Sequence, residues 1–355
     1  MQIYNMNTYI KERLDADAQD FRDSGKVRSG YKNLDSITNL YPGLYVIGAT
    51  SSLGKTTFMH QMGDQIAQSG HPVLFFSFEQ SALELISKSL AREIAKTSWW
   101  NAADIMTSLQ IRNNPSDNQV KKAIQAYSDI AKNLFIVECD FNSKVSDIGS
   151  VVADFIKNND VKPVVIVDYL QVIKPVSTKY SSREAIDSVV SYLKDLQREH
   201  KITMVVISSL NRQNYMTSVD FESFKESGGI EYTADVVWGL QLDVLRDPIF
   251  DEQGKINEKR ALIKNAKSVI PRKIEFVCLK NRFGVSSFEC YFDYYSDRDL
   301  FVSKDYSVPY KTHNTDSSND DYRERTKDIN YIIPEKQSEY ELCDDEVPFP
   351  EVEEK

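Results

Sequence analysis

A run of small residues between an apolar segment and a helical pattern constrains this chain more than any other feature. The segment Leu44-Tyr45-Val46-Ile47-Gly48 predicts a strand, and the loop Ala49-Thr50-Ser51-Ser52-Leu53-Gly54-Lys55-Thr56 follows it directly. Backbone N–H groups in such a loop can turn towards phosphate oxygens. The helix that begins near Gly54 directs the positive end of its dipole to the same point. The pattern therefore predicts a nucleotide-binding loop on an α/β sheet.

Two side chains of this loop have predicted chemical roles. Lys55 is placed to reach the β- and γ-phosphates of ATP, and Thr56 offers its hydroxyl to Mg²⁺. Ala49 stands where the general pattern has glycine, so a chance match in a Ser/Gly-rich turn is the alternative. The flanking strand and helix patterns disfavour that alternative. The predicted nucleotide contacts in this stretch are Ala49, Ser52, Gly54, Lys55, Thr56 and Thr57.

Composition limits the classes of function that the chain can have. Its 355 residues are 41% hydrophobic, which is enough to bury one substantial core. No apolar run approaches the roughly 18 residues of a membrane-spanning helix, and the N-terminus is polar and acidic, so we expect a cytoplasmic protein without a membrane partner. The four cysteines and four histidines show no paired spacing, which disfavours disulfides and zinc.

The net charge of −10 is unevenly distributed along the chain. Residues 303–355 hold 15 acidic and 7 basic side chains, so the preceding 302 residues hold 38 acidic and 36 basic ones. A nearly neutral body neither supports nor excludes a nucleic-acid partner. We expect any such binding to come from local loops and not from a broad basic face.

Apolar segments alternate with helical patterns over residues 44–208. Continuous runs such as Val164-Val165-Ile166-Val167 are typical of strands buried on both faces, so we predict an α/β fold with a mostly parallel sheet covered by helices. The predicted strands are 44–49, 73–78, 134–138, 163–168 and 202–208, with helices at 54–69, 81–96, 119–132, 146–159 and 182–200. Further strands at 236–240, 259–265, 273–279 and 287–294, joined by short turns, predict an antiparallel extension.

The two ends of the chain differ from this pattern. Residues 1–24 predict a polar helical arm with apolar side chains at roughly helical spacing. Such an arm needs a surface, either its own body or a neighbouring subunit, and a disordered leader is the alternative. Residues 25–302 are predicted to form the nucleotide-binding domain, and residues 303–355 an acidic, disordered tail.

Two carboxylates follow predicted strands. Asp168 ends the run Val164–Val167 and so lies at the carboxyl edge of the sheet, where open α/β sheets bind their ligands; it is the expected partner of Mg²⁺. Glu79 ends the run 73–78 in the same way and is predicted to polarise the attacking water. Each alone could be a solvated turn residue, but two beside a phosphate loop predict a hydrolytic site.

Lys280 and Arg282 close the predicted strand 273–279. At positions i and i+2 they project to the same side. They could reach one phosphate cluster in the same subunit, or in a neighbouring subunit as an arginine finger. The alternative is a pair of solvated cations that blunt a sheet edge, and spacing alone does not decide between the two.

Together these motifs resemble the C-terminal motor domain of the DnaB family of replicative helicases, a branch of the RecA-like ATPases. The resemblance extends over about residues 25–302, and the order and spacing of its motifs make it more specific than any single one. The motifs are Ser29-Gly30-Tyr31 with Leu34-Asp35, Gly48-Ala49 through Thr56, Phe75 to Glu79, Val167 to Gln171, Ser208 to Arg212, Glu226 to Glu231 with Ala234-Asp235, and Lys280-Asn281-Arg282 with Gly284. Ala49 is similar to what that family has at this position.

The resemblance implies a RecA-like P-loop NTPase core and a role for each matching position. Lys55 and Thr56 hold the phosphates and Mg²⁺, Asp168 is the Walker B acid and Glu79 is the catalytic base. Lys280 and Arg282 act in trans on the neighbour's nucleotide, which implies a homo-oligomeric ring, expected to be a hexamer. The arm 1–24 becomes a linker helix that docks on the next subunit.

The resemblance also implies two groups of residues that couple ATP to DNA. The group that senses the γ-phosphate comprises Gln171 and the segment Ser209–Arg212, in which Asn211 and Arg212 are nucleotide-binding candidates. The group that grips the backbone of single-stranded DNA comprises Lys225, Glu226 and Gly228.

Three features depart from the family pattern. Ser209 replaces a usual Gln, which affects the expected γ-phosphate sensor. Lys225 replaces a usual Arg, which keeps a phosphate contact but loses a bidentate fork. Only about 24 residues precede the motor, so we expect the N-terminal primase-binding domain to be absent, as in a trimmed helicase of a phage or mobile element or in an accessory ATPase.

The acidic tail contains a short segment that resembles a known peptide. Asp344-Asp345-Glu346-Val347-Pro348-Phe349 is similar to the acidic tip of bacterial single-stranded DNA-binding proteins, which docks on replication and repair partners. There the phenylalanine ends the chain, whereas here Pro350–Lys355 follow. The segment is a candidate contact for a replication-protein partner, and a solubilising tail is the alternative.

The predicted function is an ATP-driven DNA helicase of the DnaB type, which moves 5′ to 3′ along single-stranded DNA in replication. The alternative is a nucleotide-switched DNA-binding ATPase, such as a loader or regulator. Ser209 and the missing N-terminal domain favour this alternative, whereas Glu79, Lys280 and Arg282 oppose it. A small-molecule kinase is a third hypothesis, for which the sequence shows no acceptor pocket or lid.

Overall fold

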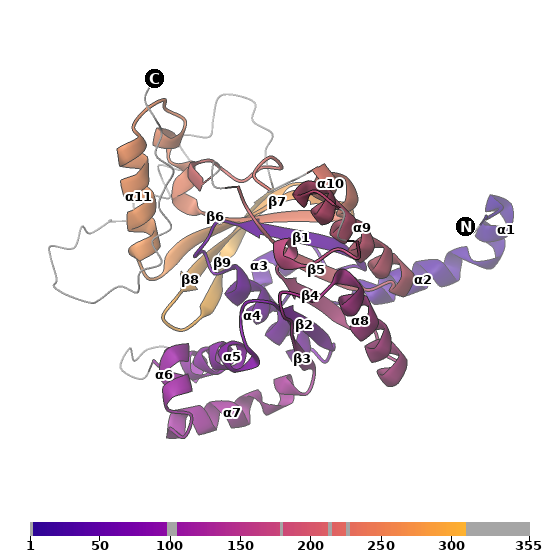
Figure 1. Ribbon diagram of the computed structural model, residues 1–355, viewed down its shortest axis with the longest axis horizontal. Helices are drawn as coiled ribbons and strands as arrows, with labels where there is room; N and C mark the ends of the chain where they lie inside the picture. Colours follow the sequence, from indigo (N-terminus) through magenta and orange to yellow (C-terminus); the bar gives the residue numbers. More distant parts are fainter. Residues whose placement is uncertain (1–2, 98–104, 178–179, 212–214, 225–227, 310–355) are drawn as a thin grey trace. The chain divides into compact units, whose positions relative to one another are not determined.

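A nine-stranded sheet lies at the centre of the computed structural model, which describes residues 3–97, 105–177, 180–211, 215–224 and 228–309 (Figure 1). The strand order is β3-β2-β4-β5-β1-β6-β7-β8-β9. The strands are β1 (Gly43–Ala49), β2 (Val73–Ser77), β3 (Leu134–Glu138), β4 (Val164–Asp168), β5 (Thr203–Ser209), β6 (Val236–Leu242), β7 (Arg272–Asn281), β8 (Phe288–Tyr295) and β9 (Leu300–Pro309).

The sheet changes from parallel to antiparallel at one point. In this order, neighbouring strands from β3 to β6 (β3, β2, β4, β5, β1 and β6) pair in parallel. Neighbouring strands from β6 to β9 pair antiparallel. The predicted parallel α/β fold with an antiparallel extension is therefore confirmed. Every residue of β1 is buried, because apolar side chains alternate between two cores: Leu44 and Val46 pack on one face, and Tyr45 and Ile47 on the other.

Helices cover both faces of the parallel strands. Side chains of α4, α5 and α7 contribute to the core on one face, and those of α8 and α9 to the core on the other. These are the five helices that the sequence predicts. The helices are α1 (Met6–Glu12), α2 (Leu14–Ser24), α3 (Lys32–Asp35), α4 (Lys55–Gln68), α5 (Ala82–Thr97), α6 (Ser108–Asn113), α7 (Asn118–Ala131), α8 (Val145–Asn159), α9 (Ser182–His200), α10 (Gly228–Thr233) and α11 (Ile256–Ser268), with short 3-10 turns at Leu170–Val172, Asp243–Arg246 and Pro248–Phe250.

The strand predicted at 259–265 is wrong, because this segment is the middle of helix α11 (Figure 1). Ile263 is buried, and Leu262 and Ala266 pack against the same core. These positions recur at helical spacing on one face of the helix. An apolar pair within a short segment does not distinguish a strand from a helix by itself, and the tertiary contacts decide here.

The antiparallel extension has a strand that the sequence does not predict. Strand β9 follows the last predicted strand, 287–294, and continues to Pro309, whose Cα pairs with that of Phe288 on β8. The predicted domain boundary at residue 302 therefore falls inside β9. The mixture of charged and polar residues after Lys304 obscured this strand, because hydrogen bonding to β8 and not an apolar pattern defines it.

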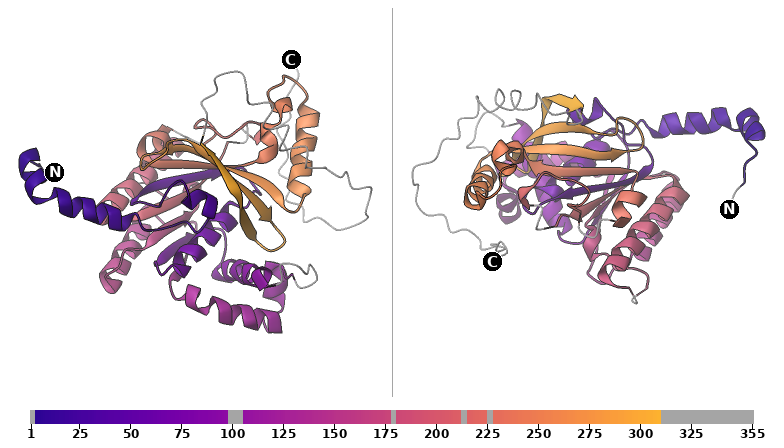
Figure 2. Two further views of the ribbon diagram at one scale, coloured as in Figure 1. Left: turned by 180° about the vertical axis from the view of Figure 1, so that it is seen from behind. Right: turned by 90° about the horizontal axis from the view of Figure 1, so that it is seen from above.

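The N-terminal arm forms two helices where one was predicted. Helices α1 and α2 meet at Arg13, and neither buries a residue; Figures 1 and 2 show them leading away from the sheet. Ile3 is 91% exposed, and Met6 and Ile10 are each 60% exposed. In the described part of the chain, no helix is both long enough and apolar enough to cross a membrane.

Candidate nucleotide-binding site

The loop between β1 and α4 has the backbone geometry of a phosphate-binding loop. Ala49 is the last residue of β1, and Gly54 precedes α4 with a φ of 83°. A Cβ atom on Gly54 would lie 2.8 Å from Cε1 of Tyr294, so both its conformation and its surroundings require glycine. Ser52 has a φ of 65°, which is uncommon for a residue with a side chain.

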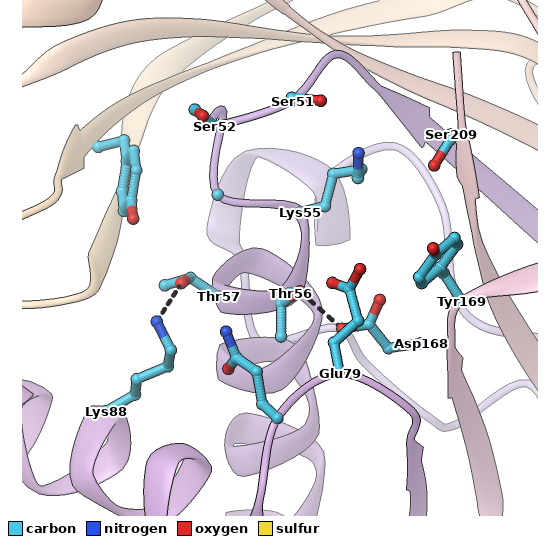
Figure 3. Close-up of a pocket in the computed structure, with 13 residues that line it drawn as sticks. Ser51, Ser52, Lys55, Thr56, Thr57, Glu79, Lys88, Asp168, Tyr169 and Ser209 are labelled. Carbon is cyan, nitrogen blue, oxygen red and sulfur yellow. Dashed lines mark hydrogen bonds between the residues drawn. The ribbon is translucent and has the colours of Figure 1, made fainter. Parts of the chain in front are cut away.

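A cavity of about 510 Å³ opens at the carboxyl edge of the parallel strands, beside this loop (Figure 3). Six of its lining residues belong to the loop and the start of α4, and the others come from the ends of β2, β4, β5 and β8 and from α5. The lining residues are Ser51, Ser52, Gly54, Lys55, Thr56, Thr57, Glu79, Gln80, Lys88, Asp168, Tyr169, Ser209 and Tyr294. Most of them are polar, as a site for a charged phosphate chain requires.

Thr56 and Asp168 lie in direct contact, as expected of two Mg²⁺ partners. The Thr56 hydroxyl donates to Oδ2 of Asp168 at 2.6 Å (Figure 3). Burial raises the pKa of the Asp168 carboxyl to about 6, although the bond from Thr56 opposes this shift. A bound cation would oppose it further, and a hydroxyl with one carboxylate suits Mg²⁺, which keeps several waters and phosphate oxygens as ligands. The residues present therefore fit Mg²⁺.

Lys55 is the first residue of α4, and its Nζ donates to the carbonyl of Ala49 at 3.0 Å. Burial lowers the pKa of this ammonium group, while the carboxylates of Asp168 and Glu79 oppose the shift. Glu79 is exposed to the cavity, two residues after the end of β2; Figure 3 shows its side chain beside Asp168. Lys55 and the two carboxylates, from three separate segments of the chain, thus lie around one cavity.

Lys88 and Tyr294 are among the cavity residues that sequence reasoning did not find. Lys88 on α5 donates to the Thr57 hydroxyl at 3.3 Å (Figure 3). It also pairs with Asp299 at 2.7 Å. Tyr294 on β8 closes the side of the cavity next to Gly54. No motif spacing indicates either residue, because both reach the loop through the packing of α5 and of the antiparallel extension.

Gln171 connects the ends of two neighbouring strands. Its Nε2 donates to the Ser208 hydroxyl at 2.8 Å, and its Oε1 accepts the N–H of Ser209 at 3.0 Å. Ser209 lines the cavity, but Gln171 does not. In this arrangement Gln171 holds the end of β5, and it is connected to the cavity only through its hydrogen bond with Ser209.

The segment after β5 is only partly described. The Asn211 side chain donates to the carbonyls of Glu222 at 3.1 Å and Phe224 at 3.4 Å, and it does not line the cavity. Its nucleotide contact stays a prediction. Arg212, Lys225 and Glu226 lie outside the described residues, and Gly228 is the first residue of α10.

The two candidate trans-acting cations lie apart from the cavity of their own chain. Lys280 Nζ donates to the carbonyl of Glu231 in α10 at 2.7 Å. Arg282 Nη1 contacts Oδ1 of Asp235 at 3.2 Å, although the arginine side chain is 71% exposed. The structure therefore does not bring Lys280 and Arg282 to the phosphate loop of the same subunit.

A parallel sheet with this loop at its carboxyl edge, a carboxylate on each of two neighbouring strand ends and an antiparallel extension defines a RecA-like P-loop ATPase fold. The model of the DnaB-like helicase C-terminal domain family matches residues 26–294. The chain therefore belongs to that family.

Curated relatives agree with this assignment. A probable replicative DNA helicase of Trieres chinensis is 26% identical over 242 residues, which cover 65% of this chain and 50% of that protein. The replicative DNA helicase DnaB of Helicobacter pylori strain 26695 is 24% identical over 290 residues, 73% of this chain and 56% of that protein. The chain thus spans about half the length of these relatives.

Two solved structures share the fold. A solved ATPase domain superposes with a TM-score of 0.65 at 22% identity, covering 83% of this chain and 99% of that one. A DnaB-like replicative helicase, described with its interactions with primase, superposes with a TM-score of 0.64 at 20% identity, covering 85% of this chain and 67% of that one.

Proposed function

We propose that this chain is an ATP-hydrolysing motor of the DnaB type, which translocates 5′ to 3′ along single-stranded DNA and unwinds duplex DNA in replication. One observation carries the proposal: Lys55, Thr56, Glu79 and Asp168 surround a single cavity, whereas Lys280 and Arg282 lie elsewhere on the same chain. An ATPase site that is shared between neighbouring subunits has this division of residues.

The chain's own residues have distinct parts in this mechanism. The loop N–H groups and Lys55 bind and orient the phosphates, while the Thr56 hydroxyl and the Asp168 carboxylate hold the metal. Bound Mg²⁺ would neutralise developing charge on the β- and γ-phosphates. Glu79 accepts the proton of the attacking water. Arg282 and Lys280 of the neighbouring subunit would stabilise the charge of the transition state.

The proposed assembly is a homo-oligomeric ring, expected to be a hexamer, around single-stranded DNA. Curated relatives of this chain are named replicative DNA helicases, which supports these partners. Lys225, Glu226 and Gly228 are the proposed DNA contacts, and Asp344–Phe349 the proposed contact for a replication protein. A cytoplasmic location, expected from the sequence, fits this role.

A nucleotide-switched DNA-binding ATPase is the second candidate. The observation in its favour is Ser209, which lines the cavity at the position where the family resemblance expects a glutamine that senses the γ-phosphate. Such a protein would hydrolyse ATP and bind DNA without separating strands.

Strand displacement on forked DNA separates the two candidates. We expect displacement only from forks with a 5′ tail, and none with Lys55→Ala, because this variant removes the cation that holds the phosphates. Lys132→Ala is the matched control, since the Lys132 side chain is 72% exposed at the C-terminal end of α7, away from the cavity. DNA-stimulated ATPase without displacement would exclude the helicase and support the switch.

A further inference from the structure

The outer side of the phosphate loop contacts two cations that do not line the cavity. Arg272 Nη1 donates to the carbonyl of Ser52 at 2.8 Å, and Lys267 Nζ donates to the carbonyl of Ser51 at 3.4 Å. Both cations come from the junction between α11 and β7. This part of the antiparallel extension therefore supports the loop on the side that faces away from the cavity.

The guanidinium of Arg272 is itself held in place. Its Nε donates to the carbonyl of Lys267 at 2.6 Å. Its Cζ lies 5.7 Å from the ring centre of Tyr294, the residue that pairs with Arg272 across β7 and β8. Tyr294 in turn stacks on Phe301, with ring centres 4.2 Å apart. Arg272 thus reaches the loop from a rigid position.

Ser52 is the residue of the loop that needs such support. Its φ of 65° lies in the left-handed region, which is unfavourable for a residue that has a Cβ. The peptide group that follows it is planar and trans, so its C=O and N–H point in opposite directions. A bond that holds the Ser52 carbonyl outward therefore directs the N–H of Leu53 inward. The bond from Lys267 to the Ser51 carbonyl does the same for the N–H of Ser52.

We propose that Arg272 is a positioning residue for nucleotide binding. It holds Ser52 in the left-handed conformation that turns the loop N–H groups towards the phosphates, with Lys267 in support. This inference rests on the proposed binding of ATP at this loop. Because Arg272 contacts a carbonyl oxygen outside the cavity, its effect on affinity passes through the backbone of the loop and not through direct contact with the nucleotide.

The test is a titration of the full chain with a fluorescent ADP analogue in the presence of Mg²⁺. Arg272→Ala is expected to raise Kd about tenfold, because the free-energy cost of holding one strained residue without support corresponds to about that loss of affinity. Ser52→Gly alone sets the reference Kd for the double variant, because Ser52 itself lines the cavity. The double variant should bind within about threefold of Ser52→Gly, because glycine adopts a positive φ without steric cost and no longer needs the bond from Arg272.

Lys273→Ala is the matched control, since Lys273 is the next cation along β7 but its Nζ donates to Asp293 at 2.7 Å and not to the loop. Its Kd should equal that of wild type. Suppose that Arg272→Ala raises Kd tenfold and that the double variant does not recover this affinity. The positioning role would then be refuted, because glycine at position 52 relieves backbone strain but cannot replace a cation that acts directly on the phosphate charge. A Kd for Arg272→Ala within twofold of wild type would refute it as well.

Two further measurements keep the test decisive. If Arg272→Ala melts below the assay temperature, Arg272→Lys replaces it. One ammonium group cannot reach the carbonyls of both Ser52 and Lys267, so we expect a Kd between those of wild type and the tenfold-weakened variant. An unchanged Kd overturns the proposal. A wild-type chain that binds no nucleotide would overturn the proposed function. Binding by wild type with no effect of Arg272 would overturn only the inference on Arg272.

Discussion

Mixing two inactive variants tests whether Glu79 and Arg282 act at one site from different subunits. Arg282→Ala removes the proposed trans-acting cation, and Glu79→Gln removes the proposed base. Loss of an arginine finger lowers the rate of phosphoryl transfer by about 10³-fold or more, so each variant alone should show almost no DNA-stimulated ATPase activity.

The structure indicates that neither change unfolds the chain. The Arg282 side chain is 71% exposed and makes one 3.2 Å contact with Asp235. Because the guanidinium is mostly solvated, its contact with the buried Asp235 is screened and contributes about 1 kcal/mol or less. Asp235 also keeps two other partners when Arg282 is removed, because Lys194 and the N–H of Leu44 both donate to its Oδ2. Glu79 is exposed to the cavity, so its amide analogue should be tolerated equally well.

The assay measures DNA-stimulated ATPase activity after the two variants are dissociated, mixed in equal amounts and reassembled. A complete site needs Glu79 on one side and Arg282 from the next subunit. In randomly mixed rings with head-to-tail interfaces, each requirement is met at half of the sites, so about one quarter of all sites are complete. We therefore expect about a quarter of the wild-type rate.

Two results would refute this reasoning. A mixed sample that is no more active than the average of its two components, although a size measurement shows mixed rings, would mean that both groups act within one subunit or that Arg282 has no catalytic part. More than about a tenth of wild-type activity in Arg282→Ala alone would contradict the magnitude that a trans-acting arginine supplies.

Three other substitutions have defined expected results. Thr56→Val removes the hydroxyl that contacts Asp168 and should lower Mg²⁺-dependent ATPase activity at least about 100-fold; activity near wild type would contradict the metal role. Phe58→Ala empties a fully buried position between the rings of Tyr31 and Phe301 and should lower the free energy of unfolding by about 3–5 kcal/mol in denaturant titration. Glu289→Gln should stabilise the chain at pH 8 by about 2–3 kcal/mol but not near pH 4, because burial and the neighbouring carboxylate of Glu275 raise the pKa of Glu289 to about 7. Between about pH 4.5 and 7 the folded state thus binds more protons than the unfolded state, so the free energy of unfolding of wild type falls as pH rises; a parallel pH dependence of wild type and variant would contradict this.

Local sequence pattern was sufficient for the first five parallel strands, whereas β6, predicted within the antiparallel extension, also pairs in parallel with β1. Continuous apolar runs such as Val164–Val167 define strands buried on both faces, and the helices between them have one apolar stripe each. The segment 259–265 was predicted wrongly, because a short apolar run between charged residues suits either a strand or a helix. Strand β9 was not predicted, since its pairing with β8 and not an apolar pattern of its own defines it.

The sequence by itself determined which residues are candidates for the site. Gly54, Lys55, Thr56, Glu79 and Asp168 each lie at or beside the end of a regular element, and parallel strands bring their carboxyl ends to one edge, so local pattern predicts that these residues meet. The observed contact between Thr56 and Asp168 agrees with that expectation.

Only the tertiary structure decided what surrounds this chemistry. Lys88, Tyr294 and Arg272 reach the loop from α5, β8 and β7, elements that are remote in sequence and have no motif in common with it. The physical reason is that packing between distant segments, unlike the period of a strand or helix, is not encoded within a short stretch of residues. The tertiary structure likewise separates Lys280 and Arg282 from the cavity of their own chain, which spacing along one strand could not reveal.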